Sequence, residues 1–479
     1  MNAARQFRHA ARAAAQDAEI AGILRFNIAT YDAAVALGRG RFLDWREARR
    51  RAEAIKRDAI AQLDRYLEEF ERRIIARGAA VHWAPDAAAA REIILEIARR
   101  HNVRRVVKSK SMVSEEIHLR EALEQAGMAT LETDLGEYIV QLRNEPPYHI
   151  VTPAMHLRRE HIAGLFHQKL GTPADETSPE ALVRAARREM RQRFVAADLG
   201  ITGANFLIAD HGLVAITENE GNARLCASLP PVQVVLTGIE KLLPRLADLA
   251  LFWPLLATAG TGQPITCYNS LLGGPRRGGE PDGPRELHIV LLDNGRSRVL
   301  ADAAQRELLH CIRCGACLNA CPVFQTIGGH AYATTYPGPI GAALTPLLRG
   351  PAYDHLAYAT SLCGACAEAC PVGIEIHHQL LRDRAQAAAA RRRPWSERLE
   401  IRALAWAAAK PRRFERAGRL ARRLLRLRPQ AIDGTRLDPL RPWTRYRQAP
   451  EPPPQSFRAW WRQRNSPPAP NSMAAEPPS

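Results

Sequence analysis

Two short cysteine runs in the last third of the chain restrict its possible folds more than any other feature. Residues 311–322 read CIRCGACLNACP, and residues 360–371 read TSLCGACAEACP. The first run has the spacing C-x2-C-x2-C-x3-C-P, which is typical of proteins that hold two iron–sulfur clusters. The second run repeats it, except that Thr360 stands where the first run has Cys311. Such a pair predicts a small module in which cysteines from both runs meet.

The spacing also predicts which cysteine binds which cluster. In two-cluster proteins the fourth cysteine of a run binds the cluster of the other run. This rule assigns cluster 1 to Cys311, Cys314, Cys317 and Cys370. Cluster 2 receives Cys321, Cys363 and Cys366 and lacks a fourth thiolate, because that position is Thr360. Zinc is the weaker interpretation, since one four-ligand site would leave three of the seven cysteines without a role.

Because cluster 2 lacks a fourth thiolate, three interpretations of its composition and ligands are open. The cluster could be [4Fe–4S], with an oxygen group, water or a partner's group on the fourth iron. It could be [3Fe–4S], which has no fourth iron. Alternatively, Cys226 or Cys267 could supply the thiolate, although isolated cysteines more often serve as small buried apolar residues. Our prediction is two iron–sulfur clusters, in the first place 2 [4Fe–4S], with [3Fe–4S] as the alternative for cluster 2.

The distribution of the cysteines and the N-terminal residues indicate a reducing compartment. Seven of the nine cysteines lie in the two runs, and the N-terminus has charged residues where a secretory signal has an apolar core. We therefore expect a cytoplasmic protein. The longest apolar run, LALFWPLLATAG at 249–260, is about half the length of a membrane span, so we expect no transmembrane segment.

The pattern of apolar residues divides the 479-residue chain into five regions. Residues 1–80 have helical spacing. Residues 81–299 alternate β-branched runs with helical segments, which predicts an α/β domain with a mainly parallel sheet covered on both faces. Its expected strands are 104–109, 128–134, 204–210, 213–217, 232–238 and 287–293, and its expected helices include 114–127 and one from Ile239. Residues 300–390 form the helical two-cluster, ferredoxin-like domain, 391–448 a basic helical region, and 449–479 a disordered tail.

Most of the chain's net positive charge lies in the last two regions. Residues 391–479 contain 21 Lys and Arg but only 7 Asp and Glu, whereas the whole chain has a net charge of +17. Contact with an acidic partner or with the surface of an anionic membrane is one interpretation, and a solvated basic face is another. Nucleic acid is disfavoured, because these Arg-rich helices match no recognised binding fold.

Three further segments contain residues that could bind or react. Glu218, Glu220 and Asn222 could hold an anionic ligand, and Glu220 could act as a carboxylate nucleophile, but we favour a role in shaping a turn. Residues 108–111, Lys-Ser-Lys-Ser, follow a strand and precede a helix, where an anion could bind. His330 and Tyr336 lie between the cysteine runs and could pack on a cluster, although ordinary loop packing is as plausible.

Long segments outside the cysteine runs resemble one family. They are VFQTIGGHAYATTYPGPIGAALTPLL (323–348), KSKSMVSEEIHL (108–119), ETDLGEYIVQL (132–142) and GANFLIADHGLVAITENEGNARL (203–225). Together with the cysteine runs they resemble the lactate utilisation protein B family, over about residues 40–390. The family resemblance implies an N-terminal lactate-utilisation (LUD) domain, similar to the ribose-5-phosphate isomerase and CoA-transferase-like α/β fold. It also implies the same seven cysteine ligands, with the second cluster usually written as [4Fe–4S].

The resemblance implies a function as well. The family supplies the iron–sulfur component of a three-protein system that oxidises L-lactate to pyruvate, beside a cysteine-rich protein and a smaller LUD-domain protein. No G-x-G-x-x-G opens a helix in the α/β region, so we expect a non-catalytic electron-transfer subunit and name no catalytic residue. Two alternatives stay open: a catalytic 2-hydroxy-acid oxidoreductase that uses the incompletely ligated cluster, or a regulator that senses redox state or a metabolite.

Overall fold

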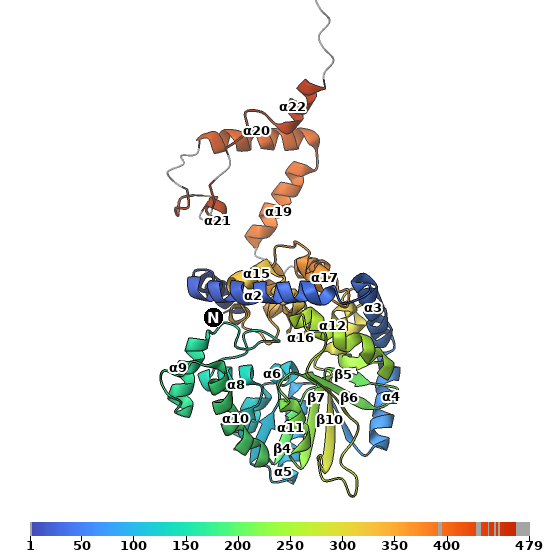
Figure 1. Ribbon diagram of the computed structural model, residues 1–479. Coiled ribbons are helices and arrows are strands. Elements are labelled where there is room, and N and C mark those ends of the chain that lie inside the picture. Colours follow the sequence, from blue (N-terminus) through green and yellow to red (C-terminus); the bar gives the residue numbers. More distant parts are fainter. Residues whose placement is uncertain are drawn as a thin grey trace, which may run out of the picture. The chain divides into compact units, whose positions relative to one another are not determined.

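The computed structural model describes residues 2–390, 395–427, 433–438, 440–444, 447–448 and 451–465. The chain divides into two compact units, Met1–Ala389 and Ala390–Ser479. Figure 1 shows the first unit as a sheet with helices around it and a group of shorter helices at one end. The predicted α/β region with a parallel sheet and the predicted helical cysteine region are both present in this unit.

A six-stranded parallel sheet forms the centre of the first unit. Its strands are, in spatial order, β1 (Ala80–Ala84), β10 (Glu286–Leu292), β7 (Val232–Gly238), β4 (Leu199–Thr202), β2 (Arg105–Lys108) and β3 (Ala129–Glu132). Every residue of β7 and β4 is buried. Such apolar runs are what a parallel strand with both faces covered requires. The expected strands at 104–109, 128–134, 232–238 and 287–293 are confirmed.

Helices cover both faces of this sheet. On one face, Ile94 and Ile97 of α5 (Ala87–Arg100) belong to a core that includes residues of five strands. On the other face, α8 (Leu135–Arg143), α9 (Arg159–Leu170) and α10 (Pro179–Val195) form a second core around Phe166. The rest of that face belongs to the largest core of the unit, which contains Val235 and Ile289 together with residues of the cysteine region. The sheet and the cysteine region are therefore joined by one continuous core.

Two of the predicted strands belong to a separate sheet. Strands β5 (Phe206–Ile208) and β6 (Leu213–Glu218) form an antiparallel hairpin, which β8 (Leu242–Leu243) and β9 (Tyr268–Leu272) extend to four strands. The connection between β5 and β6 is only four residues long, 209–212. It is too short for the crossover that parallel neighbours require. These two strands were expected, but their antiparallel arrangement was not.

Two predicted helices differ from the structure. The helix expected from Ile239 is a 3-10 turn, η1 (Ile239–Lys241), followed by strand β8, and the next α-helix is α12 (Leu249–Thr261). A helix that began at Ile239 would contain Pro244 in its interior, where proline removes a hydrogen bond and clashes with the preceding turn. The helix expected at 114–127 is two helices, α6 (Met112–Glu116) and α7 (Leu119–Gln125). His118 separates them with a left-handed φ of 51°.

The predicted helical region at the N-terminus consists of α1 (Ala3–Ala14), α2 (Ala18–Arg39), α3 (Trp45–Ala61) and α4 (Leu63–Ala76). Helix α2 is long and apolar enough to cross a membrane, by length and composition only. In the folded chain, however, α2 contacts α12 and α15 (Pro322–Ile327) and contributes Leu24 and Ile28 to the largest core. Figure 1 shows α2 lying across the helices of the cysteine region. These contacts identify α2 as a helix of the folded unit.

The cysteine region is helical throughout. It contains α13 (Arg296–Ala301), η3 (Arg306–His310), α14 (Ala316–Asn319), α15, η4 (His330–Tyr332), α16 (Gly338–Arg349), η5 (Pro351–Tyr358), α17 (Ala365–Ala369) and α18 (Ile376–Ala389). Helices α1, α2 and α3 all contact elements of this region. The N-terminal helices therefore pack against the cysteine region.

The second unit contains α19 (Trp395–Ala408), α20 (Pro411–Leu427), α21 (Arg441–Thr444) and α22 (Phe457–Arg464). Helices α19, α20 and α22 contain no buried residue. Arg462 of α22 pairs with Glu415 of α20 at 2.7 Å. Of the tail predicted to be disordered, residues 449–450 and 466–479 lie outside the described residues, and α22 forms between them.

Candidate iron–sulfur centre

The two cysteine runs fold into the same local structure. Arg313 and Leu362, at equivalent positions, have left-handed φ values of 62° and 57°, and Gly315 and Gly364 have φ values of 81° and 83°. A short helix follows each glycine, α14 in the first run and α17 in the second. Glycine suits these turns because it has no Cβ to oppose a positive φ. The sequence repeat is thus also a structural repeat.

Cysteines from both runs line one buried pocket. Cys311, Cys314 and Cys317 come from the first run, and Cys370 comes from the second. The thiol of Cys370 interacts electrostatically with those of Cys311, Cys314 and Cys317. We call these four residues the buried cysteine group. The structure brings together the four side chains that the crossover rule assigns to cluster 1.

The remaining three cysteines of the runs form the surface cysteine group. Cys321 comes from the first run, and Cys363 and Cys366 come from the second. The three thiols interact electrostatically, Cys321 with both Cys363 and Cys366. Cys321 and Cys366 are buried, whereas Cys363 is exposed. Cys363 is therefore the one exposed cysteine of the two runs, whereas Cys311 of the buried cysteine group is partly buried.

The sulfurs of the two runs are not grouped as the ligands of one zinc ion would be. Four thiolates on one tetrahedral zinc ion, at about 2.3 Å from it, would be roughly 3.8 Å apart. Among the described residues, no three cysteine sulfurs lie within 4.8 Å of one another. The two runs also contain seven cysteines, more than one zinc ion binds.

The surroundings of the sulfurs also fit iron–sulfur clusters. The N–H groups of Ala316 and Ala365 donate hydrogen bonds to the sulfurs of Cys314 and Cys363, at equivalent points of the two runs. Burial raises the pKa of the Cys370 thiol to about 12. A buried thiol with such a pKa stays protonated at neutral pH, and binding to a metal is what deprotonates it.

The position of the missing cysteine has a structural role of its own. The Oγ1 atom of Thr360 accepts a hydrogen bond from the N–H of Leu362 at 3.0 Å. Cys226 packs in the core around Phe166, where its sulfur lies 3.4 Å from Oγ1 of Thr133, and it is absent from the core that contains the buried cysteines of the runs. Cys267 is exposed, immediately before β9. Both lone cysteines belong to the α/β region.

Basic side chains surround the buried cysteine group. Lys56 of α3 and Lys241 of η1 are buried and Arg313 is partly buried, and all three interact with the thiol of Cys311. Arg49 donates from Nε to the carbonyl oxygen of Cys370 at 2.8 Å. Burial lowers the pKa of Lys56 to about 7 and that of Lys241 to about 8, since low polarity disfavours their charged forms. Negative charge on the thiolates would offset this penalty.

A buried ion-pair network connects this site to the sheet. Arg296, just after β10, donates from Nε to Glu240 at 2.6 Å and from Nη2 to Glu116 at 2.8 Å. Glu240 also pairs with Arg313 at 3.4 Å. Burial acts to raise the pKa of Glu240, but the positive charges of Arg296 and Arg313 lower this pKa to about 2. Because Glu240 follows β7, the network lies at the carboxyl ends of the parallel strands, where α/β sheets commonly bind ligands.

The other candidate residues are engaged within the protein. Glu218 accepts hydrogen bonds from the N–H groups of Ala223 and Arg224 in α11 (Asn222–Ser228), at 2.6 and 2.8 Å. Glu220 accepts from the N–H of Leu135 at 3.0 Å. These bonds agree with the turn-shaping role that we favoured for the two carboxylates. In the expected anion site, Lys108 pairs with Glu132 at 2.8 Å, so its ammonium group already has an acidic partner.

The connector between the runs interacts with the cysteines through a residue that was not predicted. His330 bonds through Nε2 to the carbonyl oxygen of Pro146 at 2.8 Å, and Tyr336 donates to Glu116 at 2.6 Å. Tyr332, instead, is buried and interacts with the thiols of Cys317 and Cys321, one from each cysteine group. It thus lies beside both groups.

Sequence reasoning missed most of the charged shell around the buried cysteine group. Glu240 and Lys241 lie two and three residues after the end of the buried strand β7, and the rule that sites lie at carboxyl strand ends could have indicated them. Arg313 stands inside the first cysteine run. Lys56 lies in an N-terminal helix among many other basic residues, and no sequence signal separates it from them.

A glycine substitution tests how tightly the first run is packed. In Gly315→Ala, the new Cβ would lie 2.9 Å from Cγ2 of Val151 and 3.0 Å from Cε1 of His149, whereas in Gly364→Ala the nearest atom would be 3.9 Å away. Both variants adopt an unfavourable positive φ, at about 1–2 kcal/mol. We expect Gly315→Ala to reduce the iron content after anaerobic reconstitution more than Gly364→Ala, its matched control. Equal iron contents would contradict this account of the packing.

Models of known families match three consecutive parts of the chain. The LUD domain matches residues 67–292, a 4Fe-4S dicluster domain matches residues 307–374, and "Lactate utilisation protein B, C-terminal" matches residues 378–466. The dicluster match contains both cysteine runs, and it supports the iron–sulfur interpretation of the two cysteine groups.

Curated relatives cover nearly the whole chain. "Lactate utilization protein B" of Oceanobacillus iheyensis is 42% identical and covers 89% of this chain and 88% of its own length. The protein of the same name from Bacillus velezensis is 40% identical over 88% of this chain and 89% of its own. "Uncharacterized electron transport protein YkgF" of Escherichia coli is 39% identical and covers 92% of this chain and 94% of its own length. A crystal structure of a DUF162 family protein from Deinococcus radiodurans is 15% identical, covering 48% of this chain and 98% of that one, with a TM-score of only 0.28.

Proposed function

Because this chain belongs to the lactate utilisation protein B family, we propose that it is the iron–sulfur electron-transfer component of a system that oxidises L-lactate to pyruvate. Bound clusters would supply one-electron chemistry, accepting electrons from a partner and passing them on. We propose that the chain relays electrons through two clusters and leaves the chemistry on lactate to a partner. It would work in the cytoplasm, where its thiols stay reduced.

The observation that carries this proposal is the interleaving of the cysteines. Cys370 of the second run lies with the buried cysteine group, and Cys321 of the first run lies with the surface cysteine group. Two clusters held in this way must be close neighbours, which suits a relay. We infer that Cys311, Cys314, Cys317 and Cys370 hold cluster 1 and that Cys321, Cys363 and Cys366 hold cluster 2. We infer two [4Fe–4S] clusters, with a non-cysteine ligand completing cluster 2 and [3Fe–4S] as its alternative.

The two cysteine groups have different surroundings, which gives the relay a direction. Lys56, Lys241 and Arg313 stabilise negative charge at the buried cysteine group, so we expect the higher reduction potential there. At the surface cysteine group, the exposed Cys363 lies beside the carboxylate of Glu368. We propose that electrons exchange with partner proteins at Cys363, because it is the one exposed cysteine of the two runs.

The α/β region supports the site and has no separate catalytic role in this proposal. We propose that it has the fold of ribose-5-phosphate isomerase and CoA transferases, as the family resemblance implies. Glu220, the residue that could serve as a CoA-transferase-type nucleophile, accepts the N–H of Leu135 at the start of α8. The ends of β7 and β10 instead supply the ion pairs beside the buried cysteine group. The partners would be the cysteine-rich protein and the smaller LUD-domain protein of the lactate system.

The proposal is tested by assaying L-lactate oxidation with an artificial electron acceptor, using the cluster-loaded chain alone and with its two partner proteins. We expect turnover only when all three are present. Turnover by the chain alone would instead support the catalytic alternative. If the partners pass electrons from lactate to the natural acceptor equally fast without this chain, its role is regulatory.

We propose that the basic second unit binds the surface of an anionic membrane. Helix α20 exposes Leu420 and Leu424 among its arginines, and α22 exposes Trp460 and Trp461. Helices that combine exposed apolar side chains with arginine are suited to the boundary between lipid headgroups and acyl chains. Contact with an acidic partner protein is the competing explanation.

Vesicle binding separates the two explanations. The full chain should co-sediment with phosphatidylglycerol vesicles and not with phosphatidylcholine vesicles, and binding should weaken with salt. Replacing Leu420 and Leu424 by glutamate should weaken binding at least about tenfold, because burial of one leucine contributes about 1.5–3 kcal/mol. The same change at Leu43, which is exposed in the first unit, serves as the control. No binding to anionic vesicles, together with loss of partner assembly after removal of residues 391–479, would favour the partner protein.

A further inference from the structure

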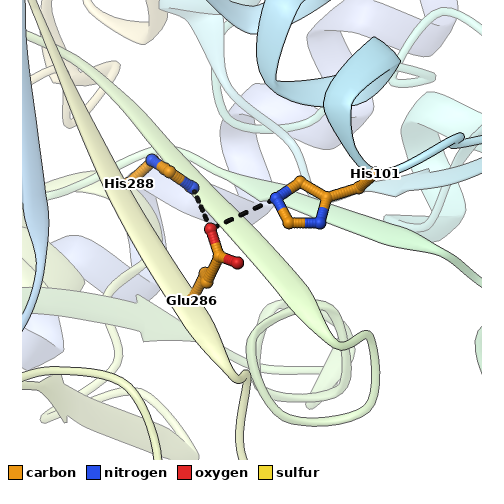
Figure 2. Close-up of side chains that lie close together, drawn as sticks. All are labelled: His101, Glu286 and His288. Atoms are coloured by element: carbon orange, nitrogen blue, oxygen red, sulfur yellow. Dashed lines mark hydrogen bonds and ion pairs between the residues drawn. The ribbon is translucent and has the colours of Figure 1, made fainter.

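A group of histidine and glutamate side chains lies at the amino-terminal edge of the parallel sheet. Glu286 is the first residue of β10, His288 follows two residues later on the same face, and His101 ends helix α5. Figure 2 shows both imidazole rings directed at one carboxylate oxygen of Glu286. The buried ion-pair network beside the cysteines is at the opposite, carboxyl-terminal edge of the same strands, so this group is separate from the site already described.

The distances in this group match those of a metal site. Nε2 of His101 lies 3.2 Å from Oε2 of Glu286, and Nε2 of His288 lies 3.3 Å from the same atom. All three ligand atoms lie within 4.8 Å of one another. A tetrahedral zinc ion, with bonds of about 2.0–2.2 Å to nitrogen and oxygen, holds its ligand atoms roughly 3.3–3.5 Å apart. Two histidines and one glutamate are also a common zinc ligand set.

The histidine in the sheet has a partner for its second ring nitrogen. Nδ1 of His288 lies 3.1 Å from Nε2 of His82, on the neighbouring strand β1. Histidines that bind metals almost always use the other ring nitrogen in such a hydrogen bond, which fixes the ring's orientation. His288 is nearly fully buried, with 5% of its side chain exposed. His82 is itself half-buried on the edge strand, where it can orient the ring of His288 as a metal ligand.

The group is also open to solvent. The side chain of Glu286 is 46% exposed and that of His101 is 23% exposed. An ion could therefore enter without rearrangement of the sheet, and its fourth position would face water. Two other groups of His and Glu are present among the described residues, Glu145 with His156 and His330, and Glu375 with His377 and His378. The three residues of the second of these lie within four positions of one another in the sequence.

We propose that His101, Glu286 and His288 bind one divalent transition-metal ion, with Zn²⁺ as the probe, and that His82 orients His288. The ion links the C-terminal end of α5 to the first residues of β10. These two elements are far apart in the sequence. The bound ion therefore stabilises this edge of the sheet, because it binds the folded chain and not the unfolded one. Nothing in this site depends on the clusters or on electron transfer.

The test uses the full chain with its clusters loaded, under anaerobic conditions. Equilibrium dialysis against Zn²⁺ should give one zinc per chain with no loss of iron, and the thermal unfolding midpoint should rise. Glu286→Gln and His101→Ala should each weaken zinc binding at least tenfold, and His82→Asn about tenfold to a hundredfold. His211→Ala is the control, because His211 is an exposed histidine that pairs with a single carboxylate.

X-ray absorption at the zinc edge identifies the ligands directly. We expect only nitrogen and oxygen neighbours, at about 2.0–2.2 Å. Sulfur neighbours at about 2.3 Å would mean that zinc had entered the cysteine groups, and this result would overturn the proposal. Stoichiometric binding that Glu286→Gln and His101→Ala leave unchanged would overturn it as well, as would the absence of stoichiometric binding to the wild-type chain.

Discussion

Replacing Cys370 by alanine should remove the cluster of the first cysteine run and leave the cluster of the second run in place. This outcome is opposite to what the position of Cys370 in the sequence suggests. Its sulfur lies with Cys311, Cys314 and Cys317, in the pocket that these four residues line. A cluster that loses one of four thiolates in a buried pocket has no nearby substitute. We expect the iron content to fall by about half, from roughly eight atoms per chain to roughly four.

The measurement combines iron and sulfide analysis with EPR spectra of the reduced protein. In the wild-type chain two neighbouring paramagnetic clusters should broaden each other's signals, and in Cys370→Ala a single uncoupled signal should remain. Cys321→Ala is the reciprocal variant, which should lose the cluster of the second run. Cys226→Ala is the matched control, because Cys226 is equally buried but lies in another core. Cys370→Ser keeps a side chain of nearly the same shape as cysteine. It therefore serves as a control for a general folding defect in Cys370→Ala.

A different pattern would contradict interleaved ligation. If Cys370→Ala and Cys366→Ala lost the same cluster, each run would bind its own cluster. If Cys226→Ala lowered the iron content as much as Cys321→Ala, a distant thiolate would complete cluster 2, and the non-cysteine ligand that we propose would be wrong.

The second large effect concerns Arg296. In Arg296→Met, the carboxylates of Glu240 and Glu116 remain buried and lose their main partner. Removing one member of a buried ion pair typically destabilises a protein by 3–5 kcal/mol, because an uncompensated charge stays in the interior. We expect a loss of about this size in the free energy of unfolding. Urea unfolding, followed by circular dichroism under anaerobic conditions, measures it.

A surface ion pair provides the matched control. Arg99 pairs with Glu92 at 2.8 Å, and the two side chains are 57% and 64% exposed. Arg99→Met should therefore change the free energy of unfolding by no more than about 1 kcal/mol. Adding Glu240→Gln to Arg296→Met should restore part of the lost stability, since it removes one of the unpaired charges. An Arg296→Met variant as stable as Arg99→Met would show that the network contributes little.

The sequence predicted the cysteine site far better than its surroundings. The cysteine spacing repeats a short local structure, so residues such as Cys370 could be placed from the run alone. Lys56 is separated from Cys311 by more than 250 residues and belongs to an N-terminal helix. Its contact with the site depends on how α3 packs against the cysteine region. Such long-range packing leaves no local signal in a single sequence.

The strands of the sheet also differ in how well local sequence patterns predict them. The buried strands β7 and β10 were predicted, because runs of β-branched and aliphatic residues are typical of a covered parallel sheet. Strand β4 was missed: it is only four residues long, and it reads LGIT. Glycine in a strand weakens the sequence pattern, but here Gly200 permits a close approach, since an added Cβ would lie 1.9 Å from the carbonyl oxygen of Cys226.

The most direct test of the central claim is the number of clusters in one chain. Anaerobically purified or reconstituted protein should contain roughly seven to eight iron atoms and a similar number of sulfides per chain, with Mössbauer spectra that resolve two clusters. Seven atoms would indicate [3Fe–4S] in cluster 2, and eight would indicate two [4Fe–4S] clusters. A chain that holds four iron atoms or fewer, or that binds zinc at the two cysteine runs in their place, would contradict the relay.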